Sequence, residues 1–198
     1  MTIFYRLGNK LYINITNQCP CNCVFCIRNY TNGVGDAPTL WLPHEPTIGE
    51  IKAAFDARQD LNQVNEIVFC GYGEPMTRAQ DVIEIAKYIK TKTSLLVRLN
   101  TNGLVNFLSP GFDISSLAIM DTISVSLNAD DAEAYYRIVQ PVYGIDTYNG
   151  LMQFITEAAR YTKVQLTIME TLAPERIENC QRIAATLGLP LIVRSMTG

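Results

Sequence analysis

Short apolar stretches alternate with amphipathic stretches along almost the whole sequence, and this alternation limits the possible folds more than any other feature. The apolar runs have the length and the β-branched content of buried strands, whereas the stretches between them repeat apolar residues every three or four positions, as helices do. The expected strands are residues 10–16, 66–70, 95–99, 122–127, 163–169 and 190–194. The expected helices are residues 47–58, 78–91, 114–119, 129–138, 147–162 and 174–188.

Strands joined by helical crossovers predict a parallel sheet, because each right-handed crossover returns the chain to the end of the sheet where the previous strand began. A hairpin is expected before this sheet, with residues 2–6 turning at Gly8 and Asn9 into the strand at 10–16. We therefore expect an α/β fold, a partial (β/α)6 TIM-like barrel with parallel strands and an N-terminal hairpin. Reacting groups in such barrels lie at the carboxyl ends of the strands. Residues 1–198 are expected to form a single domain.

A cysteine-rich loop follows the first parallel strand, with Cys19, Cys21, Cys23 and Cys26 within eight residues. Cys19, Cys23 and Cys26 have the spacing CxxxCxxC. Thiolates are soft ligands that suit zinc or an iron–sulfur cluster. Structural zinc needs a fourth ligand, which Cys21 or His44 would have to supply, and no second CxxC is present in the sequence. The spacing favours an iron–sulfur cluster with one iron left open, while zinc and buried or disulfide-bonded cysteines stay as alternatives.

The cysteine spacing, with Phe25 directly before Cys26, resembles the signature of the radical S-adenosylmethionine (SAM) superfamily. In that family three cysteines hold three irons of a [4Fe–4S] cluster, and the amino and carboxylate groups of SAM bind the fourth iron. The resemblance therefore implies that Cys19, Cys23 and Cys26 are the metal ligands, with Phe25 beside the adenine. It leaves Cys21 as a spare thiol.

A glycine-rich turn after the strand at 66–70 is similar to the GGEP motif, which receives the SAM amino group in this family. Tyr72 stands where a glycine is commonest. Glycines allow a backbone to approach a ligand closely, although an ordinary strand-to-helix turn has the same residues. The turn reads Gly71, Tyr72, Gly73, Glu74 and Pro75.

Polar residues at the ends of the following strands also match the family in order. The segment from Asn100 to Gly103 is similar to the [D/N]TNG segment that contacts the ribose, which implies this role for Asn100. Ser126 and Asn128 end the next strand, where the family places groups for the SAM carboxylate and ribose. On position alone, two residues on one side of the strand at 163–169 are expected near the nucleoside, and these are Thr167 and Met169.

The resemblance implies a reaction and its partners. The reduced cluster gives one electron to SAM, methionine leaves, and a 5′-deoxyadenosyl radical abstracts hydrogen from a substrate. A one-electron reductant of the flavodoxin or ferredoxin type is implied as a partner. The chain is similar in scale to carboxy-deazaguanine synthases and to glycyl-radical-enzyme activases. The residues around the cysteines look closest to TatD-associated radical SAM proteins, which suggests association with a TatD-type nuclease. No residue identifies the substrate or a catalytic side chain.

Composition restricts the other classes of function. A net charge of −3 and a pI near 5.2 disfavour a nucleic-acid partner, because they offer no broad basic surface. No apolar run approaches the roughly 20 residues that a membrane helix needs, and no export leader is evident. We therefore expect a cytoplasmic protein whose cysteines stay reduced, which favours metal binding over disulfides.

Three features keep more than one interpretation. The loop at 29–45, which contains Trp41 and His44, is long enough to be functional, and we expect it to shape the substrate side of the barrel mouth. Arg194 on the last strand would meet an anionic group of substrate or SAM, or would have a helix-packing or salt-bridge role. The alternative function is a non-catalytic iron–sulfur electron carrier or a zinc-stabilised module, in which the glycine-rich turn and Ser126 would be incidental.

Overall fold

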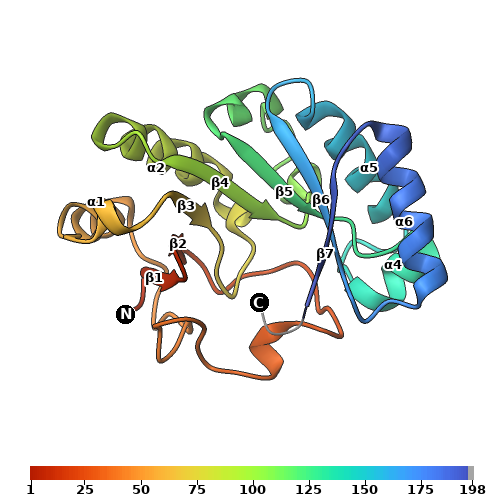
Figure 1. Ribbon diagram of the computed structural model, residues 1–198, viewed down its shortest axis with the longest axis horizontal. Coiled ribbons are helices and arrows are strands. Elements are labelled where there is room, and N and C mark those ends of the chain that lie inside the picture. Colours follow the sequence, from red (N-terminus) through yellow and green to blue (C-terminus); the bar gives the residue numbers. More distant parts are fainter. Residues whose placement is uncertain (196–198) are drawn as a thin grey trace.

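The strands of the sheet lie side by side in the same order as they occur in the sequence. The computed structural model describes residues 1–195 and contains a seven-stranded sheet (Figure 1). The first two strands are antiparallel and every later neighbour is parallel. The expected open (β/α)6 barrel with an N-terminal hairpin is therefore confirmed. The strands are β1 (Phe4–Leu7), β2 (Lys10–Ile13), β3 (Glu66–Phe69), β4 (Leu96–Thr101), β5 (Thr122–Ser126), β6 (Lys163–Met169) and β7 (Leu191–Arg194).

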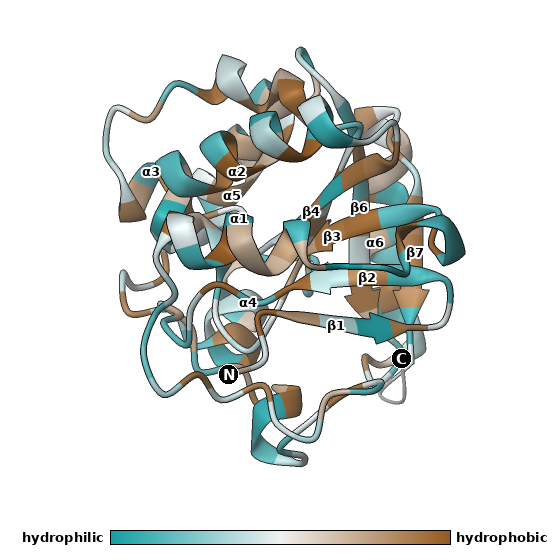
Figure 2. Ribbon diagram, turned by 90° about the vertical axis from the view of Figure 1, so that its left-hand side faces the viewer, coloured by the Kyte–Doolittle hydropathy of each residue, from teal (hydrophilic) through white to brown (hydrophobic). Residues whose placement is uncertain are grey.

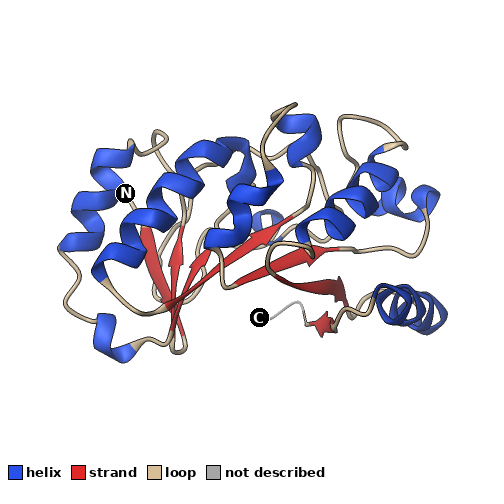
Figure 3. Ribbon diagram, turned by 90° about the horizontal axis from the view of Figure 1, so that it is seen from above, coloured by secondary structure: helices blue, strands red, loops and turns tan. Residues whose placement is uncertain are grey.

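Helices connect the parallel strands, and most of them cover one face of the sheet (Figure 3). The α-helices are α1 (Ile48–Asp56), α2 (Ala79–Lys92), α3 (Val105–Leu108), α4 (Ala132–Val139), α5 (Thr147–Ala158) and α6 (Pro174–Leu187). Short 3₁₀ helices are found at Ile27–Asn29, Leu61–Gln63, Pro75–Arg78 and Ile114–Ile119. No helix of residues 1–195 combines the length and the apolar character that crossing a bilayer requires.

Alternation along the strands gives the sheet an apolar face and a polar face. In β4, Val97 and Leu99 are fully buried in the main hydrophobic core, which also contains side chains of α2 and α5. Arg98 and Asn100 alternate with them and therefore point to the opposite face, which we call the inner face. Figure 2 shows hydrophobic residues in the strands and in the helices that cover them. The inner face is thus the side of the sheet on which polar groups are available.

Capping explains where the helices begin. Thr47 and Glu50 form the predicted capping box at the start of α1. Helix α4 begins later than the expected residue 129, because the Asp131 side chain accepts a hydrogen bond from the Ala134 backbone. The helix expected at 114–119 is a 3₁₀ helix, and the short helix α3 was not predicted.

Strand β2 ends at Ile13 rather than at residue 16, since the chain leaves the sheet to form other contacts. The Asn14 amide donates to the carbonyl of Ile3, and its side chain donates to the carbonyl of Leu40. The second contact joins the end of β2 to residues 30–45, which we call the strap. In Figure 1 the strap is the orange segment below the sheet.

The strap is held by aromatic packing that the sequence did not predict. Tyr72 is buried with Tyr5, Ala37 and Leu40 in a small second core. Its hydroxyl donates a hydrogen bond to the strap carbonyl of Thr31. The Trp41 ring packs edge-on against it, with a centroid separation of 5.0 Å. The tyrosine that replaces a glycine in the motif therefore anchors the strap.

We predict that Tyr72→Ala releases the strap. The substitution removes a buried aromatic side chain, which typically costs about 3 kcal/mol or more of unfolding free energy. Limited proteolysis should then cut within residues 30–45 at least about tenfold faster than in the wild type. Tyr161→Ala is the control, because Tyr161 is exposed outside the strap. Equal cleavage rates for all three proteins would contradict this account.

Candidate cofactor site

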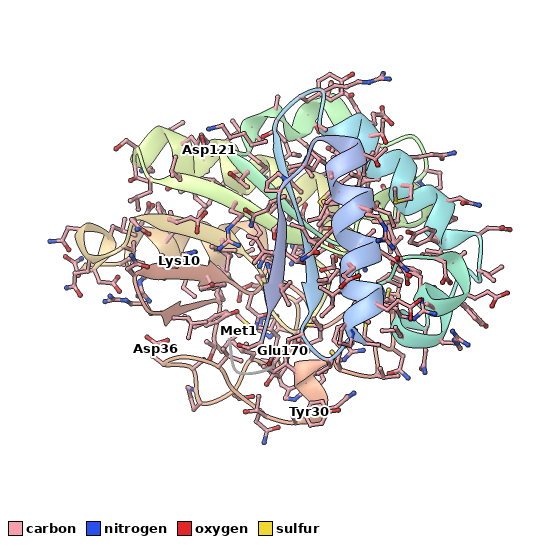
Figure 4. All side chains as sticks on the ribbon, turned by 45° about the vertical axis from the view of Figure 1, so that its right-hand side comes forward. Met1, Lys10, Tyr30, Asp36, Asp121 and Glu170 are labelled. Carbon is pink, nitrogen blue, oxygen red and sulfur yellow. The ribbon has the colours of Figure 1, made fainter. Side chains whose placement is uncertain are left out.

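The cysteine loop, residues 19–26, lies at the carboxyl end of the sheet. Figure 4 shows Asp121 and Glu170 near opposite ends of the strands, with Tyr30, just after the loop, beyond Glu170. The loop is fixed by backbone bonds to the chain at the end of α4. The Val24 amide donates to the carbonyl of Ile138 at 3.0 Å. These bonds attach the loop to a distant part of the chain.

Three thiols of this loop interact directly. A hydrogen bond from Cys21 lowers the pKa of Cys19 to about 6, and the same contact raises the pKa of Cys21. The Cys21 thiol also contacts Cys23 and lies 3.6 Å from the Asn102 amide nitrogen. Burial raises the pKa of Cys26. Cys21 is 4% exposed, whereas the other three are half-buried, so Cys21 points into the core.

The donor set fits an iron–sulfur cluster by its chemistry, since soft sulfur donors gather on one loop. Among residues 1–195, no three His, Cys, Asp or Glu side chains are already arranged closely enough to enclose a metal ion. His44, the alternative zinc ligand, contacts Glu50 beside α1. The match to an iron–sulfur cluster therefore depends on two features: the donors are thiols, and they lie on one loop.

A buried hydroxyl beside the cysteine loop supports the same fit. The Tyr135 hydroxyl has no hydrogen-bond partner among the described residues, although its side chain is 1% exposed. Burial raises its pKa, and the nearby thiols of Cys21 and Cys23 add to this effect. Unpaired buried donors are costly and rare. A sulfur ligand in this region would give the hydroxyl an acceptor.

The glycine-rich turn packs directly against the chain that leads into the cysteine loop. The Gly73 amide donates to the carbonyl of Thr16 at 3.0 Å. A β-carbon on Gly73 would lie 2.4 Å from that oxygen, and one on Gly71 would lie 2.0 Å from the Asn14 side-chain oxygen. Both glycines are therefore required for close packing whether or not a ligand is bound. Alanine at these positions would disturb the cysteine loop itself.

Glu74 connects this turn to the end of β4. Its side chain is 5% exposed and accepts hydrogen bonds from the Met76 amide at 3.0 Å, the Thr101 hydroxyl at 2.7 Å and the Asn102 amide at 2.7 Å. Burial raises the pKa of Glu74 to about 7, although these donors oppose the shift. The carboxylate thus positions Asn102, whose side chain contacts Cys21.

Asn100 and Asn102 have different surroundings at the end of β4. The Asn100 side chain, predicted to face the ribose, accepts a hydrogen bond from Arg98 at 3.0 Å on the inner face. Asn102 contacts the cysteine loop, and the sequence analysis did not select it. The sequence could have indicated Asn102, because a residue two positions after Asn100 lies on the same side of an extended chain.

The remaining predicted residues lie at the ends of β5 and β6 or on the cysteine loop. Ser126 pairs in register with Thr167, whose hydroxyl donates to the Val125 carbonyl at 3.4 Å. Asn128 has a φ of +58°, so it leaves the strand alternation, and its side chain is buried. Met169 and Phe25 are half-buried at the same end of the sheet.

We predict that Glu74 makes stability depend on pH. Its folded-state pKa of about 7 lies above the ordinary value of 4.5, so the folded protein binds more protons between these values. Its contribution to the unfolding free energy should therefore fall as the pH rises from about 4.5 to about 7, by up to about 3 kcal/mol. Urea unfolding across this range should show the fall in the wild type.

Glu74→Gln should remove this fall, because the amide does not titrate. Glu84→Gln is the control, since Glu84 forms an exposed ion pair with Lys52. A pH dependence that is the same in the Glu74→Gln protein and in the wild type would refute the role of this carboxyl.

Comparison with known proteins agrees with the fold and the motifs. The chain is 28% identical over 190 residues to a probable GTP 3′,8-cyclase of Thermococcus kodakarensis, covering 93% of this chain and 56% of the relative. It is 23% identical over 191 residues to a probable dual-specificity RNA methyltransferase RlmN of Clostridium acetobutylicum, covering 93% of this chain and 51% of the relative. The chain thus spans about half the length of these curated relatives.

A solved structure described as native anSMEcpe with bound AdoMet has a similar fold. Its TM-score is 0.68 at 14% sequence identity, over 93% of this chain and 51% of that chain. The sequence model of the Radical SAM superfamily matches residues 13–184, which include the cysteine loop and strands β3 to β6. The chain therefore belongs to the radical SAM superfamily.

Proposed function

We propose that residues 1–198 form one radical SAM core that cleaves SAM reductively and acts on a substrate by hydrogen abstraction. One observation carries this proposal: the cysteine loop, the Glu74 turn and the end of β4 are joined by direct contacts at one end of the sheet. We propose that the thirteen residues selected from the sequence, with Asn102 added, line the site around these contacts. An electron carrier or a zinc module would have no use for this arrangement of strand ends.

Cys19, Cys23 and Cys26 are the proposed ligands of three irons of a [4Fe–4S] cluster. Cys21 is the fourth thiol of the loop. Because it is buried, we assign it a structural role rather than a role as a cluster ligand. The Asn102 amide, 3.6 Å from the Cys21 sulfur, holds this thiol in place. The Tyr135 hydroxyl is the nearby donor available to a sulfur ligand.

The strand ends are the proposed SAM site. Gly71, Tyr72 and Gly73 offer backbone groups for the amino group, because their side chains are absent or, for Tyr72, buried under the strap. Glu74 acts as a positioning residue, since its acceptors already bind three protein donors. The proposed contacts to the adenine, ribose, carboxylate and nucleoside are Phe25, Asn100, Ser126, Asn128, Thr167 and Met169.

When bound, the cluster and SAM supply one-electron cleavage of SAM to methionine and a 5′-deoxyadenosyl radical, which takes a hydrogen atom from a substrate. The protein groups position and enclose these molecules. Asn128 would offer its side-chain amide to SAM, and Glu74 keeps the β3 and β4 ends together. The strap covers the turn at Tyr72 and helps to exclude water.

The proposed partner is a one-electron reductant of the flavodoxin or ferredoxin type in a reducing cytoplasm. Two relatives are named for reactions on GTP and on RNA, which makes a nucleotide-containing substrate a candidate here. Activity as a carboxy-deazaguanine synthase or a glycyl-radical-enzyme activase, and association with a TatD-type nuclease, stay predictions from sequence resemblance.

We predict that the cysteines differ in their effect on cluster content. After anaerobic reconstitution with iron and sulfide, Cys23→Ala should lose most of the cluster absorbance and all 5′-deoxyadenosine formation from SAM with dithionite. Cys21→Ala should keep about four irons per chain and the cluster absorbance, because three ligands suffice. Loss of the cluster in Cys21→Ala would contradict the three-ligand assignment. Bound zinc in place of iron would favour the structural module.

Asn128 offers a test of SAM binding that keeps the backbone conformation. Asn128→Gly keeps the left-handed backbone and removes only the side chain. We expect about a tenfold weaker SAM affinity with an unchanged cluster spectrum, since a well-placed polar contact is worth about 1 kcal/mol or more. Asn65→Gly is the control, because Asn65 is exposed just before β3, at the opposite end of the strands from the site. Unchanged SAM affinity in both variants would support the electron carrier.

A further inference from the structure

We propose that Arg194, Ser124 and Gln165 form a subsite on the inner face of the sheet for an anionic phosphate or carboxylate group of the substrate. The inference rests on the proposed function, because the anionic group would belong to the substrate of the proposed radical SAM site. It is carried by a half-buried guanidinium that faces the cation of Arg98 and has no carboxylate partner among residues 1–195.

The side chain of Arg194 is fixed across the inner face. One of its terminal nitrogens donates to the Ser124 hydroxyl at 3.0 Å, and Gln165 donates to the same hydroxyl at 3.2 Å. Ser124 is 1% exposed, so this contact is buried. A guanidinium has five N–H donors, and only this one has a side-chain acceptor among the described residues. The others remain available to a ligand.

The charges around Arg194 do not balance. Among residues 1–195, Glu66 is the one carboxylate that contacts Arg98 on the inner face, and it already has two cationic partners. Arg98 binds it through two nitrogens at 3.0 Å each, and Lys10 lies 3.2 Å from it. No carboxylate of residues 1–195 lies within 4.0 Å of the Arg194 guanidinium.

Burial lowers the pKa of Arg194, and the positive charge of Arg98 adds to the shift. The other titratable groups that act on it are Cys70 and Tyr12, which are neutral at their raised pKa values. A partly buried cation that has no carboxylate partner among the described residues is costly. An anion bound between Arg194 and Arg98 would neutralise this surplus.

The subsite lies next to the proposed SAM contacts, so the experiment has to separate the substrate from SAM as the source of the anion. Ser124 precedes Ser126 by two residues on β5, so both point to the same side. Two residues of a strand span about 6.6 Å, which places the Arg194 contact that far below the strand end. The proposed SAM contacts Ser126 and Asn128 lie at or beyond that end, whereas Asn100 pairs in register with Ser124, and Met169 pairs with Arg194. A substrate anion is distinguished from the SAM carboxylate by measuring SAM affinity in the same variants.

The guanidinium fork suits phosphate and carboxylate oxygens, because both accept two parallel hydrogen bonds. The experiment therefore uses inorganic phosphate and malonate as separate probes on the cluster-loaded protein. Binding is measured by titration calorimetry at constant ionic strength, for the wild type and Arg194→Met. Arg160→Met is the control, since Arg160 is exposed after α5. SAM affinity is measured for the same three proteins.

We expect saturable binding of at least one probe by the wild type and by Arg160→Met. Arg194→Met should bind that probe at least about tenfold more weakly, with SAM affinity changed less than about twofold. The probe that binds identifies the anion as phosphate or carboxylate. Equal probe binding by Arg194→Met, or no binding of either probe by the wild type, would overturn the proposal. A tenfold loss of SAM affinity would also overturn it, because the anion would then be the SAM carboxylate.

A stability measurement separates a binding role from a structural one. In buffer without either probe, Arg194→Met should unfold at the same or a higher temperature than the wild type, because an uncompensated cation is removed. A lower unfolding temperature would show that Arg194 stabilises the fold, and would contradict the subsite. Arg194-dependent probe binding by a protein that never forms 5′-deoxyadenosine would support the subsite while refuting the proposed function.

Discussion

The buried carboxylate of Glu74 is the interaction on which the candidate site depends. It joins the turn after β3 to the end of β4 through bonds to Met76, Thr101 and Asn102. Asn102 in turn contacts Cys21 of the cysteine loop. A short turn can hold three strand ends in this way because its glycines allow backbone contact at hydrogen-bond distance. This arrangement buries the Glu74 carboxyl group, and burial raises its pKa to about 7.

The two faces of the sheet have different roles. One face is apolar and carries the helices, so it supplies the stability, whereas the inner face carries Arg98, Ser124 and Arg194. Buried polar groups on such a face must be paired. Arg98 is paired with Glu66, whereas no carboxylate of residues 1–195 pairs with Arg194, which supports our proposal that Arg194 binds a ligand. The cofactor end and the proposed anion subsite therefore follow from one strand alternation.

Sequence patterns predicted the parts of the structure that depend on local periodicity and on motif spacing. The β/α order, the hairpin, the capping box at Thr47 and the shared location of the strand ends were all accessible. The anchoring of the strap by Tyr72 was not, because it joins residues far apart in sequence through packing. The same applies to the contact between Asn102 and Cys21, since no pattern reports which side chains meet across loops. Long-range contacts of this kind can be identified only in the folded structure.

Electron paramagnetic resonance of the reconstituted, dithionite-reduced protein, recorded with and without SAM, tests the central claim most directly. If the cysteine loop holds a cluster with one iron open to SAM, SAM should change the g-values of the reduced cluster. The change should require Cys23 and persist in Cys21→Ala. A cluster signal that is identical with and without saturating SAM would contradict the account, because it would leave the strand ends without the ligand that we assign to them.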